Sequence, residues 1–129
     1  MAERALAIQV AMMPRDTNAH GTIFGGILLS YLDQAGAIGA AQSVIDQGGE
    51  PPKLVTVAMN RVEFLRPVLI GDVVRFYNKT KKIGRSSVTV QVEVEAQRGK
   101  EVISVTQAEV VYVGVDLTSP DRATKPFFE

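Results

Sequence analysis

The spacing of hydrophobic and polar residues changes several times along the chain, and each change marks a predicted element. A mixed apolar stretch from Leu6 to Met13 ends at Pro14, which predicts a first strand. From about Phe24 to Ile45 the apolar residues recur at intervals of three or four, the spacing of a helix that buries one face. After Pro52 the pattern becomes that of strands.

Four strands are predicted in this second half, and short glycine-containing turns separate most of them. One of them alternates strictly, with Val or Ala on one face and Thr, Gln or Glu on the other. Because the turns are short, neighbouring strands must be mostly antiparallel. The remaining residues, from about 117 to 129, carry little pattern and are predicted to form a surface tail. The predicted strands run from Leu54 to Leu65, from Val73 to Lys79, from Val88 to Ala96 and from Glu101 to Val115.

The predicted helix is long for so short a chain, because about twenty residues make a helix of about 30 Å. Its second half, Ala35 to Ala41, consists almost entirely of small residues and includes Gly36 and Gly39. Each helical glycine costs about 1 kcal/mol relative to alanine, which suggests that another element packs close to the helix backbone. We therefore predict an α+β fold in one domain spanning residues 1–129. One long central helix is wrapped by a curved, mostly antiparallel sheet of five to six strands, the hotdog arrangement.

Composition narrows the possible functions. Hydrophobic residues make up 46% and charged residues 22% of the 129 residues, as in average soluble domains. A net charge of zero gives no overall field to attract nucleic acid or an anionic membrane. The absence of cysteine excludes disulfides and thiolate chemistry, and a single histidine makes no case for a metal site. The segment from Met1 to Arg4 lacks the apolar core of a signal peptide, so we expect a cytoplasmic protein.

Asp33 is the outstanding candidate for chemistry. It lies in the middle of an otherwise apolar helix, and helical spacing places it on one face with Gly26, Ser30 and Ala37. These small residues leave room for a ligand, and a carboxylate there can act as a general base or as a nucleophile. A solvated helical aspartate is the alternative interpretation of the same pattern.

The pair Gly25-Gly26 at the helix start is the second candidate. Unpaired N–H groups of a first helical turn, helped by the helix dipole, can stabilise an oxyanion. A loop-to-helix junction that needs unusual dihedral angles would also explain two glycines. Asp33 lies about 10 Å beyond Gly26 along the helix axis, so one carbonyl group cannot touch both within a chain. If both groups act on one bond, a homodimer with composite sites is required.

Other polar residues have weaker signals. Asn18, in the loop before the helix, can hold a water or a substrate carbonyl, although it is also a common turn residue. His20 is the only histidine and a candidate base, but a lone loop histidine is usually structural or exposed. A basic turn contains Arg85, Ser86 and Ser87 and suits phosphate groups, although such a turn is commonly a solvated hairpin. Neither a phosphate-binding loop nor a dinucleotide fingerprint occurs in the sequence.

Several segments together resemble the YciA-like acyl-CoA thioesterases, and they occur in the same order along nearly the whole chain. The first runs from Asp16 to Gly26 and is followed by Asp33. Because several motifs coincide, the resemblance is specific. The likeness continues through Phe64-Leu65-Arg66-Pro67, Gly71-Asp72-Val73-Val74, Ile83-Gly84-Arg85-Ser86-Ser87 and the stretch from Thr106 to Asp116.

The resemblance implies a hydrolase that splits acyl-CoA into a free acid and CoA and needs no cofactor beyond the CoA of its substrate. Asp33 is then the catalytic carboxylate, Asn18 positions substrate or water, and Gly25 and Gly26 offer N–H groups to the thioester carbonyl. His20 departs from the family, which more often has Asn or another small polar residue there. The family forms dimers that commonly assemble into trimers of dimers, which makes a hexamer. The residues that the resemblance assigns to CoA binding are Arg66, Arg85, Ser86 and Ser87.

Three questions stay open at this point. Asp33 either activates a water or attacks the thioester directly. A hotdog protein that only binds acyl-CoA is an alternative, but such proteins usually carry a DNA-binding segment, for which this chain has no room. A hotdog hydratase or dehydratase is another, but it typically pairs a carboxylate with a histidine on a helix or strand. His20 is instead predicted to lie in a loop ahead of Phe24.

Overall fold

The computed structural model of the protein describes residues 3–128. Met1 and Ala2, which begin the segment considered as a signal peptide, and Glu129, which ends the predicted tail, lie outside this range. None of the helices in residues 3–128 combines the length and the apolar character that a membrane crossing requires. The elements are β1 (Ala5–Ala11), the short 3₁₀ helix η1 (Pro14–Asp16), α1 (Gly25–Asp46), β2 (Leu54–Asn60), β3 (Val73–Ile83), β4 (Ser87–Arg98) and β5 (Glu101–Gly114).

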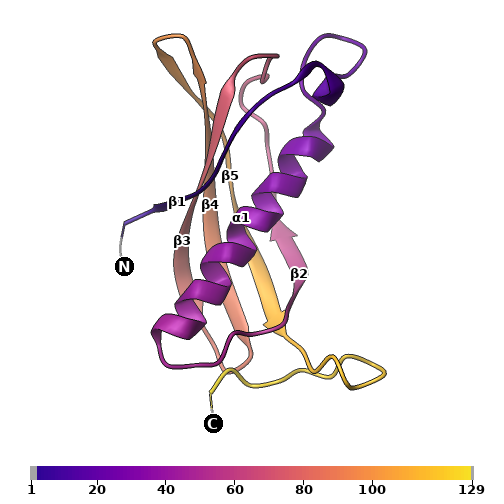
Figure 1. Cartoon of the computed structure of the whole chain (residues 1–129), viewed down its shortest axis with the longest axis vertical. Helices are drawn as coiled ribbons and strands as arrows, with labels where there is room; N and C mark the ends of the chain where they lie inside the picture. Colours follow the sequence, from indigo (N-terminus) through magenta and orange to yellow (C-terminus); the bar gives the residue numbers. More distant parts are fainter. Residues whose placement is uncertain (1–2, 129) are drawn as a thin grey trace.

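All five strands form one antiparallel sheet in the order β1-β3-β4-β5-β2. Figure 1 shows α1 running diagonally across one face of this sheet, where it packs mainly on β3 and β4. The α+β class and the single long helix are therefore confirmed, and the sheet has five strands. β1 and β2 are the two edge strands.

The core lies between α1 and the inner face of the sheet. The predicted alternation along β4 is confirmed, because Val88, Val90, Val92, Val94 and Ala96 are at most 2% exposed while their neighbours face outward. Such a strand fits the centre of the sheet, where each apolar side chain that leaves water contributes about 1.5–3 kcal/mol.

The helical glycines are explained by close contacts with the sheet. A Cβ atom at Gly36 would overlap the hydroxyl group of Tyr112, and one at Gly39 would come within 2.5 Å of the Asn78 side chain. Asn78 donates a hydrogen bond from Nδ2 to the main-chain oxygen of Ala35, at 3.0 Å. The close approach predicted from the small residues of α1 is therefore confirmed.

Two predicted strand boundaries are wrong. β2 ends at Asn60 rather than Leu65, because the following segment leaves the regular ladder and is held beside β5 by irregular bonds. In that segment the Thr106 hydroxyl donates to the carbonyl of Glu63, and the N–H of Leu65 donates to Val105. β3 continues to Ile83 rather than ending at Lys79, since the last residues of β3 pair with the start of β4.

The last described residues, 117–128, are mostly exposed. Phe127 is the exception, with an exposed fraction of 8%. Its ring lies so close to Gly114 that a Cβ atom there would come within 2.7 Å of it. One aromatic side chain thus ties the tail to the end of β5.

Candidate active site

Asp33 lies near the middle of α1, half-buried, with its carboxylate turned toward β2. Thr56 of β2 donates a hydrogen bond from its hydroxyl to Oδ1 of Asp33, at 2.7 Å. Within residues 3–128 the second carboxylate oxygen, Oδ2, has no hydrogen-bond partner. The carboxylate is therefore oriented by the sheet and keeps one oxygen available to a water or a substrate.

A second side chain contacts Asp33 from the sheet on which α1 packs. Tyr112 of β5 is 1% exposed, and its hydroxyl donates to the main-chain oxygen of Asp33 at 2.6 Å. Burial, followed by the nearby negative charge of Asp33, raises the pKa of Tyr112 well above its usual range. The phenol therefore remains a hydrogen-bond donor at neutral pH.

The start of α1 presents free N–H groups. Phe24 is the N-cap, and no side chain caps the helix. The N–H of Phe24 donates to Asp16, but for those of Gly25 and Gly26 no acceptor lies within the described part of the chain. Gly26 is exposed, and the space where its Cβ would lie is empty. A carbonyl oxygen can therefore approach these donors closely.

Asn18 mainly organises the loop that leads into α1. Its Oδ1 accepts from the N–H groups of His20 and Thr22, at 2.8 and 3.2 Å, and its Nδ2 donates to the Thr22 hydroxyl at 2.7 Å. These bonds are those of a turn residue. An amide has two N–H donors, so one donor of Asn18 is left for a water or a carbonyl. The His20 residue is exposed in the same loop.

The remaining predicted residues lie toward opposite ends of α1. Arg85, Ser86 and Ser87 occupy the turn between β3 and β4 and the first residue of β4, which pairs with the end of β5. Leu54, the first residue of β2 after α1, pairs with that same end of β5, so this turn lies near the end of the helix. Arg66 is exposed and belongs to the segment held beside the middle of β5, toward the helix start. One chain therefore does not bring all the predicted residues together.

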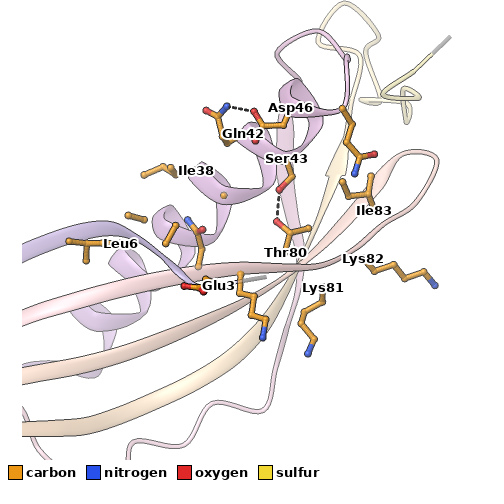
Figure 2. Close-up of a pocket in the computed structure, with 16 residues that line it drawn as sticks. Glu3, Leu6, Ile38, Gln42, Ser43, Asp46, Thr80, Lys81, Lys82 and Ile83 are labelled. Carbon is orange, nitrogen blue, oxygen red and sulfur yellow. Dashed lines mark hydrogen bonds between the residues drawn. The ribbon is translucent and has the colours of Figure 1, made fainter. Parts of the chain in front are cut away.

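A groove of about 630 Å³ lies on the other side of the helix, between the second half of α1, β1 and β3. Figure 2 shows Leu6 and Ile38 along it, and the hydroxyl groups of Ser43 and Thr80 hydrogen-bonded at 2.5 Å. None of the predicted site residues lines this groove. It is therefore separate from the site around Asp33. Elsewhere in residues 3–128, no group of three or more His, Asp or Glu side chains is placed to hold a metal ion.

Two residues of the site, Thr56 and Tyr112, were not predicted. Both lie on strands, and both reach a helix residue far away in the sequence. The only local signal was indirect: Gly36 indicated that something approaches the helix backbone, but it could not identify Tyr112.

Comparison with known proteins gives a consistent result. The family described as the thioesterase superfamily matches residues 20–103. The acyl-CoA thioester hydrolase YciA of Salmonella typhimurium is 40% identical over 126 residues, which cover 94% of this chain and 88% of the relative.

Two solved structures are similar over almost their whole length. A hexameric hotdog fold thioesterase of Campylobacter jejuni is 39% identical with a TM-score of 0.81, covering 95% of this chain and 90% of that one. The hexameric thioesterase y2039 from Yersinia pestis is 36% identical with a TM-score of 0.81, covering 97% and 98%. The hotdog arrangement predicted from the order of the elements is therefore confirmed.

Proposed function

The chain belongs to the thioesterase superfamily, and from this premise we propose that it hydrolyses acyl-CoA thioesters to a carboxylic acid and CoA. The observation that carries this proposal is the carboxylate of Asp33. It is half-buried in an apolar helix, and Thr56 orients it through one oxygen while the other stays available. A carboxylate held in this way is suited to activate a nucleophile.

Asp33 acts on the thioester by one of two routes. In the first, Oδ2 takes a proton from a water whose oxygen attacks the thioester carbonyl carbon. The C–S bond then breaks, and the thiolate of CoA takes up the proton. In the second, the carboxylate attacks the carbonyl carbon itself, and the C–S bond breaks to give an anhydride and the thiolate of CoA. Water then hydrolyses the anhydride, which frees the acid and restores the carboxylate, and its proton passes to the thiolate. Both routes place negative charge on the carbonyl oxygen, and neither requires a resident cofactor.

The free N–H of Gly26 is the proposed donor to that oxygen. It belongs to a partner subunit, since about 10 Å separates Gly26 from Asp33 along the axis of one helix. The edge strand β2 supports a dimer, because it pairs with β5 on one side only and presents Val55 and Val57, which are 40% and 55% exposed. An open strand edge with apolar side chains is a template for pairing with a second copy. Thr56 lies on this same strand.

A two-fold axis beside β2 also accounts for the divided CoA-binding residues. It would place the start of one helix near the end of the other, so that Arg66 of one subunit and the Arg85 turn of its partner face the same region. Arginine and hydroxyl groups there suit the phosphates of CoA. Because the compared structures from Campylobacter jejuni and Yersinia pestis are hexameric, we propose that three such dimers assemble into a hexamer.

The first test measures thiol release from acyl-CoAs of increasing chain length. We expect wild type to release CoA, and Asp33→Asn to lower kcat by about 10³-fold because amides are poor bases. The folded state of the variant is checked by its thermal melt. If wild type released no thiol from any acyl-CoA, the proposed activity would be wrong. If the variant kept full activity, the role of Asp33 would be wrong.

A complementation experiment tests the composite site. Gly26→Pro removes the N–H in the first turn of the helix, where no intrahelical hydrogen bond is lost, and should be inactive alone. When it is co-expressed with Asp33→Asn, a mixed dimer contains one site with both wild-type groups, so activity should return. If each site lay within one chain, every site in the mixture would carry a defect and no activity would return.

A further inference from the structure

Asp33 is held by a pair of residues that stand opposite one another in the sheet. Thr56 of β2 and Tyr112 of β5 are direct partners in the antiparallel register, so their side chains lie on the same face. Thr56 bonds to the carboxylate of Asp33 at 2.7 Å, whereas Tyr112 bonds to its main-chain oxygen at 2.6 Å. This cross-strand pair therefore fixes both the carboxylate and the main-chain carbonyl group of Asp33.

The backbone of α1 is shaped to receive the tyrosine. The phenol reaches the helix at Gly36, where a Cβ atom would occupy the place of the hydroxyl group. The register of β2 shifts just beyond Thr56, between Thr56 and Ala58. Such irregularities re-aim side chains near functional sites. The glycine in α1 thus admits Tyr112, and the bulge in β2 lies beside Thr56, the other residue that holds Asp33.

A second hydrogen bond from a sheet side chain to a main-chain oxygen of α1 allows a comparison with the bond from Tyr112. Asn78 of β3 donates to the main-chain oxygen of Ala35 at 3.0 Å, through the space left by Gly39. Both bonds fix the helix to the sheet. Only the bond from Tyr112 falls on the residue whose carboxylate faces β2, so only this one sets the position from which that carboxylate acts.

We propose that Tyr112 is a positioning residue for Asp33, and that Gly36 is required because it admits the Tyr112 hydroxyl to the helix backbone. Small displacements of a catalytic group have large effects on rate, so the bond from Tyr112 affects turnover more than substrate binding. This inference rests on the proposed role of Asp33 as the catalytic carboxylate.

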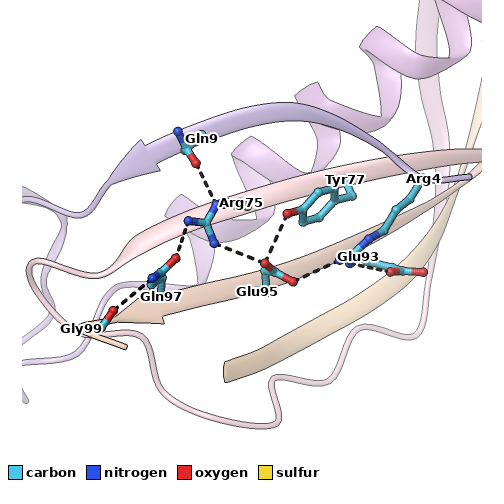
Figure 3. A network of polar contacts seen from close by, with 8 residues as sticks. All are labelled: Arg4, Gln9, Arg75, Tyr77, Glu93, Glu95, Gln97 and Gly99. Carbon is cyan, nitrogen blue, oxygen red and sulfur yellow. Dashed lines mark hydrogen bonds and ion pairs between the residues drawn. The ribbon is translucent and has the colours of Figure 1, made fainter. Parts of the chain in front are cut away.

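The first experiment replaces Tyr112 with Phe, which removes only the hydroxyl. We expect kcat to fall about tenfold, the effect of one buried hydrogen bond, while KM stays within about twofold. Tyr77→Phe is the matched control. Tyr77 follows buried Phe76 on β3 and therefore faces away from α1, and Figure 3 shows its hydroxyl directed toward Glu95, at 3.3 Å. This control should keep the wild-type kcat.

The second experiment separates positioning from general stability. Tyr112→Phe is combined with Asp33→Asn, and the residual rate should not fall further if Tyr112 acts through Asp33. Gly36→Ala should lower kcat in the wild-type background, because its methyl group displaces the phenol. Adding Gly36→Ala to Tyr112→Phe should lower kcat less than Gly36→Ala does in wild type, because the hydroxyl is gone and only the ring atoms at 3.0 and 3.1 Å still meet the methyl group.

Two results would overturn the inference. One is a kcat for Tyr112→Phe within about twofold of wild type. The other is an equal loss in the Asp33→Asn background. In either case an inactive Asp33→Asn would leave the proposed function intact. If instead Asp33→Asn kept full activity, the proposed role of Asp33 would fail and this inference with it, whereas thiol release by wild type would still support the proposed activity. Should Tyr112→Phe melt too low for kinetics, the effect of Gly36→Ala on kcat decides the question, with Val90→Ala, at a buried position on β4, as a destabilised control.

Discussion

β4 and β2 are strands of the same sheet, but their surroundings are opposite. β4 has twelve residues, pairs with a neighbour on both sides, and buries every inward-facing apolar side chain. β2 has seven residues, pairs on one side only, and exposes five of them. Val92 on β4 is 0% exposed, whereas Val57 on β2 is 55% exposed.

The difference in burial and pairing between the two strands indicates that β4 mainly stabilises the fold and β2 mainly serves function. Apolar burial gives β4 its contribution to the fold, because each buried valine is worth about 1.5–3 kcal/mol. β2 contributes less burial within the chain, but it carries Thr56 and the open edge proposed for dimer formation. Changes in β2 should therefore affect assembly and turnover, and changes in β4 should affect unfolding.

Among changes in the two strands, the largest effect is expected from a charge on the open edge of β2. Val57→Asp would place a carboxylate where the partner's strand should pair, so the protein should become monomeric. Activity should then fall by about 100-fold, the typical loss when an oxyanion donor is removed, because Gly26 of the partner is no longer present. Size-exclusion chromatography with light scattering and thiol release measure the two effects.

Val102→Asp is the matched control for this variant. Val102 lies on β5, is also 55% exposed and pairs with Gln97 of β4. It lies outside the stretch of β5, Glu109 to Gly114, that pairs with β2, so a charge there leaves the open edge of β2 unchanged. Its kcat should stay near that of wild type. An active monomer of Val57→Asp would contradict the composite site, and an intact oligomer would contradict pairing through β2.

A smaller effect is expected from the hydroxyl of Thr56. Thr56→Val keeps the shape of the side chain and removes the hydrogen bond to Asp33. A bond to a charged group is worth about 1.5–3 kcal/mol, so kcat should fall about thirtyfold. Thr56→Ser restores the hydroxyl and should recover most of the rate. Equal kinetics for the Val and Ser variants would show that the bond does not contribute to turnover.

The same contrast explains what could be predicted from sequence. β4 was predicted well because its alternation is a local property of one strand with an inner and an outer face. The end of β2 was predicted wrongly because apolar residues recur beyond it at Val62, Phe64 and Leu65, while the ladder with β5 stops at Asn60. Where pairing stops depends on the partner strand, which a local pattern does not contain.

The residues of the candidate site also fall into two groups, those that a local pattern indicates and those that it does not. Asp33 could be found because a carboxylate stands out in an apolar helix, and the helix start could be found from Gly25-Gly26. Tyr112 could not be found, because it lies 79 residues from Asp33 and reaches it only through the register of β2 with β5. Thr56 looks like any strand threonine until that register is known.

In β4 a core substitution should change stability and leave turnover alone. Val92→Ala removes two methyl groups at a position that is 0% exposed. We expect the free energy of unfolding to fall by about 1.5 kcal/mol, with kcat per folded molecule unchanged. Val102→Ala, at an exposed position, should change stability by less than about 0.5 kcal/mol. Denaturant unfolding and thiol release measure both variants. A lower kcat per folded molecule for Val92→Ala would contradict the prediction that β4 affects stability alone.

The smallest effect concerns the end of β4 and depends on pH. Arg98 forms a two-pronged contact with Asp72, whose side chain is 2% exposed, with bonds of 2.8 and 2.9 Å. Burial by itself would raise the pKa of Asp72, but the hydrogen bonds from Arg98 and from the N–H of Leu69, with the charge of Arg98, outweigh it and lower this pKa. Folding therefore favours the charged carboxylate.

The sign of the pH effect follows from that lowered pKa. The contribution of Asp72 is present above the ordinary aspartate pKa of about 3.9 and is lost as the pH falls through the lower pKa of the folded protein. Asp72→Asn should therefore melt below wild type at pH 7, and the gap should narrow below about pH 4. Thermal melts between these pH values measure the gap, and kcat at pH 7 should be unchanged. A melting gap that stays constant would mean that the Asp72 carboxylate remains ionised over this whole pH range. The end of β4 would then add no acid sensitivity, and the stability of this strand would come from apolar burial alone.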